Sequence, residues 1–127
     1  MFLWRSEPSF GHWITAFAGP HGEPYVFDSY GERAPDAWSR GAGAAALGQG
    51  ADSPRILEGM LRSGYPRIHW NEFPMQVRDP AVQTCGRWAA VRIGLRALGV
   101  EEFAQAVGLA CSALGVSPDV LVTAATV

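Results

Sequence analysis

Residues 10–30 of the chain read FGHWITAFAGPHGEPYVFDSY, and this stretch decides how the fold begins. Two of its segments, 10–17 and 24–29, are rich in aromatic and β-branched residues, as strands are. The Gly-Pro-His-Gly sequence at 19–22 between them is typical of a turn. The stretch therefore predicts a β-hairpin, in which the start of the first strand lies beside the end of the second.

Further secondary-structure signals follow the hairpin. Residues 67–73 have the composition of a third strand, and Ser53-Pro54 is a helix-start signal. Helices are expected at residues 55–62, 85–98, 101–114 and 118–125. A small mixed or antiparallel sheet packed against helices is an α+β fold. We expect one domain over residues 1–127, with a flexible loop at 41–52 and a short helix at 42–47 within it.

The composition describes an ordinary globular chain. Hydrophobic residues make up 48% of the 127 residues, and the net charge of -2 gives no reason to expect nucleic acid or an anionic membrane as a partner. No apolar run approaches the roughly 18 residues of a membrane span, and residues 1–7 do not resemble a signal peptide. Two cysteines are too few for a disulfide framework, and neither has a zinc-type partner. We therefore expect a reduced, intracellular protein, not a secreted one, without metal or cofactor.

Cys85 is the first residue that suggests chemistry. It follows a loop and opens a predicted helix, where unpaired N–H groups and the helix dipole lower the pKa of a thiol. The same N–H groups can bind an oxyanion, and Gly86 would let a substrate carbonyl approach without a Cβ in the way. The alternative is that Cys85 is simply a small buried hydrophobic residue.

A nucleophilic cysteine needs a base, and the chain has three histidines: His12, His21 and His69. His12 begins the first strand of the hairpin and Asp28 ends the second, so the two are expected to be cross-strand neighbours. A carboxylate there would fix one imidazole nitrogen and leave the other for a thiol. The ring of Trp13 could shield the imidazole from water. The alternative for Asp28 is an Asx turn at the strand end.

Four motifs in this order resemble the adenain and SUMO-protease group of cysteine peptidases: Gly11-His12-Trp13-Ile14, Tyr25-Val26-Phe27-Asp28-Ser29-Tyr30-Gly31, Gln76, and Thr84-Cys85-Gly86-Arg87-Trp88. The resemblance covers residues 10–31 and 68–98. It implies a papain-like core of the adenain type and a catalytic set of His12, Asp28 and Cys85. It also implies an oxyanion hole formed by the Gln76 amide and the Cys85 N–H, with Trp13 and Gly86 in support.

The activity that the resemblance implies is cleavage of a protein substrate through an acyl-enzyme. Small enzymes of this type resemble those of DNA viruses and mobile elements, so virion protein maturation or ubiquitin-like processing is expected. Two features depart from the family. Gln76 stands further from Cys85 than usual, which leaves Gln83 as a rival, although little chain separates Gln83 from the thiol. Only eleven residues precede His12, which suggests a minimal enzyme, a missing N-terminal region or an activating partner.

Two other functional classes remain open on the sequence alone. Bacterial effector acetyltransferases resemble the same His-acid-Cys order, with coenzyme A as the acyl donor, but no coenzyme A or inositol phosphate motif is visible. A non-catalytic virion or binding protein could keep the fold without the activity. The intact set of His12, Asp28, Gln76 and Cys85 favours the peptidase.

Overall fold

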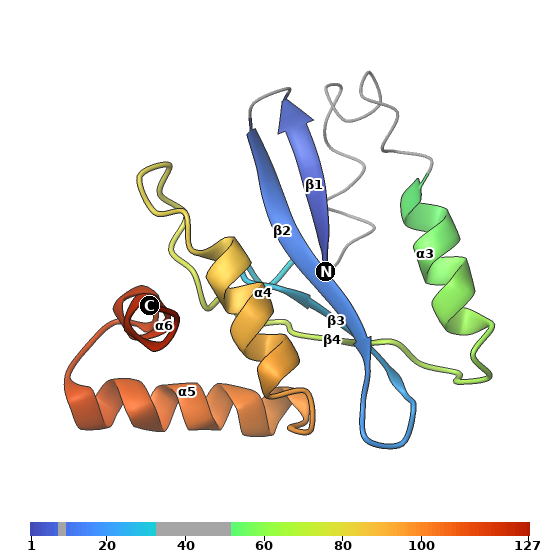
Figure 1. The fold of residues 1–127 in the computed structure, drawn as a ribbon. Helices are drawn as coiled ribbons and strands as arrows, with labels where there is room; N and C mark the ends of the chain where they lie inside the picture. Colours follow the sequence, from blue (N-terminus) through green and yellow to red (C-terminus); the bar gives the residue numbers. More distant parts are fainter. Residues whose placement is uncertain (8–9, 33–51) are drawn as a thin grey trace.

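The computed structural model describes residues 1–7, 10–32 and 52–127. Four strands form one sheet in the order β1-β2-β3-β4, and Figure 1 shows helices on both sides of it. The strands are β1 (Phe2–Glu7), β2 (Phe10–Ala18), β3 (Pro24–Asp28) and β4 (His69–Trp70). The described helices are α3 (Asp52–Leu61), α4 (Cys85–Gly94), α5 (Val100–Leu114) and α6 (Pro118–Ala125). The predicted α+β class, with a small mixed sheet packed against helices, is confirmed.

The hairpin of β2 and β3 is present as predicted. The strands are antiparallel, with Ile14 opposite Asp28 and Ala18 opposite Pro24. In the turn, the N–H of Gly19 donates to the Glu23 carbonyl at 2.8 Å, and Gly22 adopts a φ of 86°. Glycine suits that position because it has no Cβ to clash in the left-handed region.

The sheet extends beyond the hairpin on both edges. No strand was predicted before residue 10, yet β1 pairs antiparallel with β2 and places Trp4 opposite His12. On the other edge, β4 pairs parallel with β3 and is shorter than the predicted strand at 67–73. The predicted loop at 41–52 and its short helix fall almost entirely on residues 33–51, which lie outside the described part of the chain, and Asp52 already belongs to α3.

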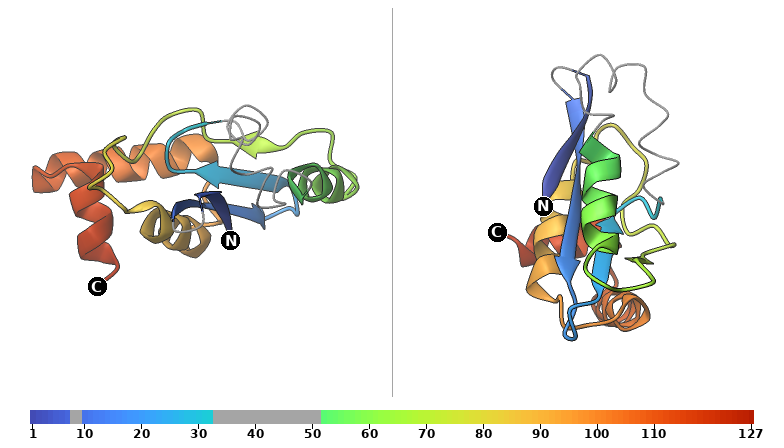
Figure 2. Two further views of the ribbon diagram at one scale, coloured as in Figure 1. Left: turned by 90° about the horizontal axis from the view of Figure 1, so that it is seen from above. Right: turned by 90° about the vertical axis from the view of Figure 1, so that its right-hand side faces the viewer.

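The two faces of the sheet carry two separate clusters of apolar side chains, because successive residues of a strand point to opposite faces. Val26 and Ile14 pack with Leu57 and Met60 of α3. The neighbouring Phe27 belongs to a larger cluster on the other face, formed with side chains from α4, α5 and α6: Trp88, Phe103, Val107 and Val122. Figure 2 shows α3 and α4 on opposite sides of the strands. The sheet is therefore the middle layer, and α4 lies against β2.

Helix α4 ends at Gly94, four residues before the predicted end. Arg92, which is 2% exposed, donates to the carbonyls of Leu95 and Leu98 at 2.9 and 2.8 Å. Its guanidinium also lies 4.6 Å from the centre of the Phe17 ring. A buried cation is stabilised by carbonyls at a helix C-terminus, so this side chain holds the chain in a turn before α5. The bounds of α5 and α6 agree with the prediction to within one residue.

Candidate active site

His12 and Asp28 meet at the open end of the hairpin. The His12 Nε2 and the Asp28 Oδ1 are 2.7 Å apart, and the two side chains are only 16% and 4% exposed. The contact is diagonal, because Ile14 is the residue opposite Asp28. The predicted neighbourhood of the two residues is confirmed, and the bond at Nε2 leaves Nδ1 as the ring nitrogen available to another group.

Asp28 is held in place by Asn71, which the sequence did not reveal, and by the Asx-type turn that was the alternative for this residue. It makes that turn and the contact with His12 together. Its backbone N–H donates to the Asn71 Oδ1 at 2.9 Å, and the Asn71 amide donates back to the Asp28 carbonyl. Asn71 directly follows β4, so its side chain continues the pairing of β4 with β3 where the ladder ends. The Tyr30 N–H donates to the Asp28 Oδ1 at 2.8 Å. Two independent contacts therefore fix the backbone and the carboxylate of Asp28.

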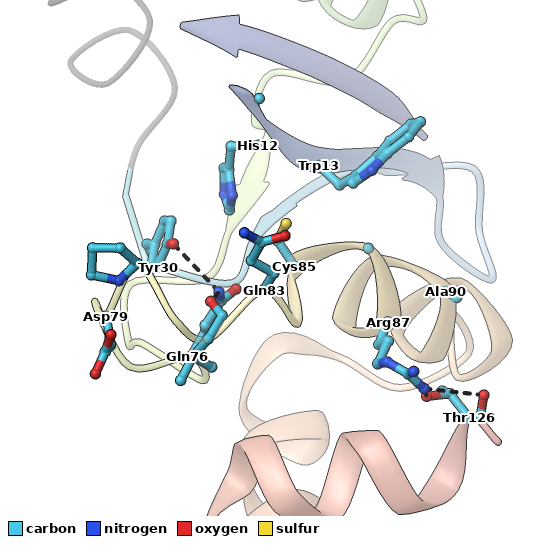
Figure 3. A pocket seen from close by; sticks show the side chains of 14 residues that line it. His12, Trp13, Tyr30, Gln76, Asp79, Gln83, Cys85, Arg87, Ala90 and Thr126 are labelled. Carbon is cyan, nitrogen blue, oxygen red and sulfur yellow. Dashed lines mark hydrogen bonds between the residues drawn. The ribbon is translucent and has the colours of Figure 1, made fainter. Parts of the chain in front are cut away.

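The Cys85 thiol lies at the first residue of α4 and lines the same cleft as the His12 ring (Figure 3). Burial raises the pKa of this thiol, but hydrogen bonds from His12 and from the N–H groups of Trp13 and Gly86 outweigh it and lower the pKa from its ordinary value of 9.0. Burial lowers the pKa of His12, but contacts with Asp28 and Cys85 outweigh it and raise the pKa to about 9. Both shifts act in the same direction, toward a thiolate beside an imidazolium.

The start of α4 lacks a side-chain cap. Thr84 stands at the N-cap position, but its hydroxyl donates to the Asp119 carboxylate of α6 and makes no capping bond. Asp119 also accepts from the Val77 N–H at 2.9 Å and from the Trp88 indole at 3.3 Å. The first turn of α4 thus keeps its N–H groups open toward the thiol, and such groups favour negative charge.

The two candidate glutamines are placed differently from the prediction. Gln76 is 3% exposed, and its Oε1 accepts from the Ser29 hydroxyl at 2.8 Å. Its Nε2 donates to the Val82 carbonyl at 2.8 Å and to the Tyr30 hydroxyl at 3.3 Å. Both amide hydrogens are therefore engaged, and the prediction that Gln76 reaches over the thiol is not met.

Gln83 takes the position that was expected of Gln76. It is exposed, and in Figure 3 its side chain points toward Cys85 and His12, whereas that of Gln76 points toward Tyr30. Gln83 is only two positions before Cys85 in the sequence, but this does not prevent its side chain from reaching the thiol. Residues 82–84 are not helical, and the loop approaches the start of α4 from the side of the thiol. The structure thus favours Gln83 over Gln76 as a side-chain donor to this site.

Trp13 contacts Gly86 and does not cover the His12 imidazole as was expected. A Cβ on Gly86 would lie 3.1 Å from the Trp13 Cδ1, so the missing side chain makes room for the indole ring. Trp13 points away from His12 along α4 (Figure 3). The ring that covers the imidazole is that of Tyr30, whose centroid lies 4.5 Å from that of His12 at an interplanar angle of 22°.

These residues line a cleft of about 630 Å³ at the junction of β2, the 76–84 loop and the start of α4. The other two histidines lie elsewhere. His21 is an exposed turn residue, and His69 stacks on Tyr25 in a different groove. Within residues 1–7, 10–32 and 52–127, no group of three or more side chains is arranged to hold a metal ion.

The fold and the cleft define a small α+β protein with a cysteine, a histidine and an aspartate in contact. The chain is 30% identical over 130 residues to "Uncharacterized protein V9" of Sputnik virophage, in an alignment that covers all of this chain and 72% of the relative. The chain belongs to the family of this virophage protein. No protein-family model matches it, and neither does any solved structure.

Among the helices that the structure describes, none has by itself the length and apolar character of a membrane span. Helices α5 and α6 meet that criterion only together, as a pair bent by 93°.

Proposed function

We propose that the chain is a cysteine peptidase of the adenain and ubiquitin-like protease type, with a papain-like arrangement of Cys85, His12 and Asp28. The observation that carries the proposal is the position of the His12 ring, whose Nε2 lies 2.7 Å from the Asp28 carboxylate and which lines the same cleft as the Cys85 thiol (Figure 3). A nucleophile from α4 and a base from β2 line one cleft, and the orienting acid at the end of β3 lies buried in contact with the base.

The chemistry follows from these contacts. The Cys85 thiolate attacks a peptide carbonyl, and the His12 imidazolium gives its proton to the leaving amine as the C–N bond breaks. The resulting thioester is an acyl-enzyme. His12, now neutral, removes a proton from water, which attacks the thioester and releases the acid, while the thiolate and the imidazolium are restored. Asp28 keeps the ring oriented and stabilises its charged form.

The oxyanion of each tetrahedral intermediate needs donors near the thiol. The open N–H groups of the first turn of α4 supply one side of this site, and the amide of Gln83 supplies the other. Preorganised donors of this kind stabilise charge that develops in the transition state. Gln76 acts one step further away, because its bonds to Ser29 and Val82 hold the loop that carries Gln83.

The substrate is a polypeptide that lies along the cleft past the Trp13 ring. Membership of a virophage protein family supports a viral substrate, and virion protein maturation is the function that best combines this origin with the site.

An activated ester tests the nucleophile without knowledge of the natural substrate. Wild-type protein mixed with p-nitrophenyl acetate should release a burst of about one nitrophenolate per chain, and mass spectrometry should place one acetyl group on Cys85. Cys85→Ala should give no burst, while Cys111→Ala should behave like the wild type. An acetyl group on Cys111 or on no cysteine would contradict the proposal.

A mixture of peptides from a digested proteome then separates peptidases from other acyl-transfer proteins. New peptide ends that appear with the wild type and not with Cys85→Ala support the peptidase. A burst with the ester that is followed by acetyl transfer to added peptides, without cleavage, would indicate an acyltransferase. Absence of both reactions in a folded, reduced protein would indicate a binding protein.

A further inference from the structure

Tyr30 contacts both His12 and Asp28, and neither contact was assigned a role by the motifs. Continuing the β2–β3 register past Asp28 places Tyr30 directly opposite His12. Its ring lies flat on the imidazole, at a centroid distance of 4.5 Å. Its backbone N–H donates to the Asp28 oxygen that also contacts His12, so one residue touches both partners of the pair.

The tyrosine ring is itself held by its neighbours. The guanidinium of Arg78 lies over the ring, with its Cζ 4.9 Å from the ring centroid, and Arg78 is paired with Glu32. The Tyr30 hydroxyl accepts from the Gln76 amide at 3.3 Å. The phenol ring of Tyr30 therefore contacts both the imidazole of His12 and the guanidinium of Arg78.

We propose that Tyr30 is a positioning residue for His12: its ring fixes the plane of the imidazole, and the guanidinium of Arg78, which is paired with Glu32, packs on the phenol ring and supports it. A single hydrogen bond at Nε2 fixes one atom of the ring and leaves the plane free to tilt about the Cβ–Cγ bond. A flat contact removes that freedom, since stacked rings resist tilting. The orientation of the plane decides whether Nδ1 faces the thiol of Cys85.

This role of Tyr30 rests on the proposed function, because the orientation of His12 matters for catalysis only in a peptidase. Its test, however, does not depend on peptide cleavage. The readout is the rate at which iodoacetamide alkylates Cys85, measured across pH, because this rate follows the thiolate fraction. If Tyr30 holds His12 against the thiol, loss of the ring weakens the contact that stabilises the thiolate. The midpoint of the Cys85 profile then rises toward the ordinary thiol value of 9.0.

Three variants distinguish the contributions of the Tyr30 ring, the Tyr30 hydroxyl and the Arg78 guanidinium. Tyr30→Phe keeps the stack and should leave the alkylation profile and the ester burst within about 2-fold of wild type. Tyr30→Ala should lower the acylation rate on the order of 10-fold, because a tilted base is misplaced by a fraction of an ångström, and should leave KM nearly level. Arg78→Ala changes an exposed side chain, so it should fold, and should lower the rate by about 2- to 3-fold.

Tyr25→Leu is the matched control, because Tyr25 also stacks on a histidine, His69, but far from the thiol. It should lower the melting temperature without moving the Cys85 profile. Equal profiles for wild type, Tyr30→Ala and Arg78→Ala would overturn the proposal, as would a Tyr30→Phe protein as impaired as Tyr30→Ala. A further outcome is that neither the wild type nor any variant forms an acyl-enzyme while the Cys85 profile still shifts in Tyr30→Ala. That outcome supports the positioning role of Tyr30 and contradicts the proposed peptidase function.

Discussion

Two histidines of this protein lie flat on a tyrosine ring, and only one of them also contacts a carboxylate and lines a cleft with a cysteine. His12 stacks on Tyr30 at 4.5 Å and 22°, and His69 stacks on Tyr25 at 4.7 Å and 20°. Each is also followed by a tryptophan, so the local sequences are alike. The difference lies in the other neighbours. Asp28 contacts the His12 Nε2 at 2.7 Å and Cys85 contacts the same ring, whereas the groove beside His69 is lined by no cysteine.

This contrast shows what each contact contributes. An aromatic stack orients an imidazole, but it gives the ring no proton to take and no charge to stabilise. The carboxylate and the thiol supply these, and they raise the pKa of His12 to about 9 against the effect of its burial. Substitutions at these positions test whether the reactivity of Cys85 depends on the carboxylate and the histidine beside it and not on the aromatic stack alone.

The largest effect is expected when each of the two stacked histidines is replaced by alanine in turn. His12→Ala should lower the rate of ester acylation on the order of 100- to 10,000-fold, because it removes the general base and the partner of the thiolate. His69→Ala should change the same rate only a few-fold. Stopped-flow measurement of the nitrophenolate burst gives both rates. A larger loss in His69→Ala than in His12→Ala would reverse the comparison.

The next largest effect concerns the two glutamines near the His12 site. Gln83→Ala should lower kcat on the order of 100- to 1,000-fold with KM nearly level, because an oxyanion donor acts in the transition state. Gln76→Ala leaves the buried Ser29 hydroxyl without its acceptor and should instead cost about 1–3 kcal/mol of unfolding free energy.

Steady-state kinetics and urea unfolding of the two variants distinguish these roles. A stable Gln76→Ala protein with a large fall in kcat, beside a near-normal Gln83→Ala protein, would restore Gln76 as the donor.

A smaller effect is expected when the charge beside His12 is removed and the shape is kept. Asp28→Asn loses a charge-assisted hydrogen bond worth about 1.5–3 kcal/mol, which corresponds to a loss of roughly 10- to 150-fold in kcat/KM. The variant should therefore keep more activity than His12→Ala. Equal losses in the two variants would mean that Asp28 does more than orient and stabilise the ring.

Local signals were enough for much of the fold. The turn glycines define the hairpin, and Ser117-Pro118 and Gly115 mark the bounds of the last helices, because caps and turns act within a few residues. Strand β1 was missed because it is an edge strand whose pairing with β2 depends on contacts outside its own six residues. The early end of α4 depends on Arg92, whose carbonyl partners lie beyond the helix.

Part of the candidate site was also predictable. The contact of His12 with Asp28 follows from a hairpin that brings its two ends together, and Cys85 was expected at the start of a helix, where the structure places it. The same register, counted two residues further, would have placed Tyr30 against His12. The path of the loop before α4 could not be read from the sequence, so Gln76 was preferred to Gln83. Asn71 was missed because its side chain replaces a backbone partner, which leaves no motif.

The most direct test of the central claim is the pH dependence of cysteine alkylation in the wild type, His12→Ala and His69→Ala. Cys85 should react with iodoacetamide at neutral pH and faster than Cys111, which packs against the core cluster. Its profile should have a midpoint below 9.0, because burial raises the pKa of the thiol but His12 and the N–H groups of Trp13 and Gly86 together outweigh it and lower the pKa. His12→Ala should move the midpoint upward, and His69→Ala should leave it in place. Faster labelling of Cys111 than of Cys85 would contradict the account. So would a Cys85 midpoint that stays at the ordinary thiol value of 9.0 in all three proteins.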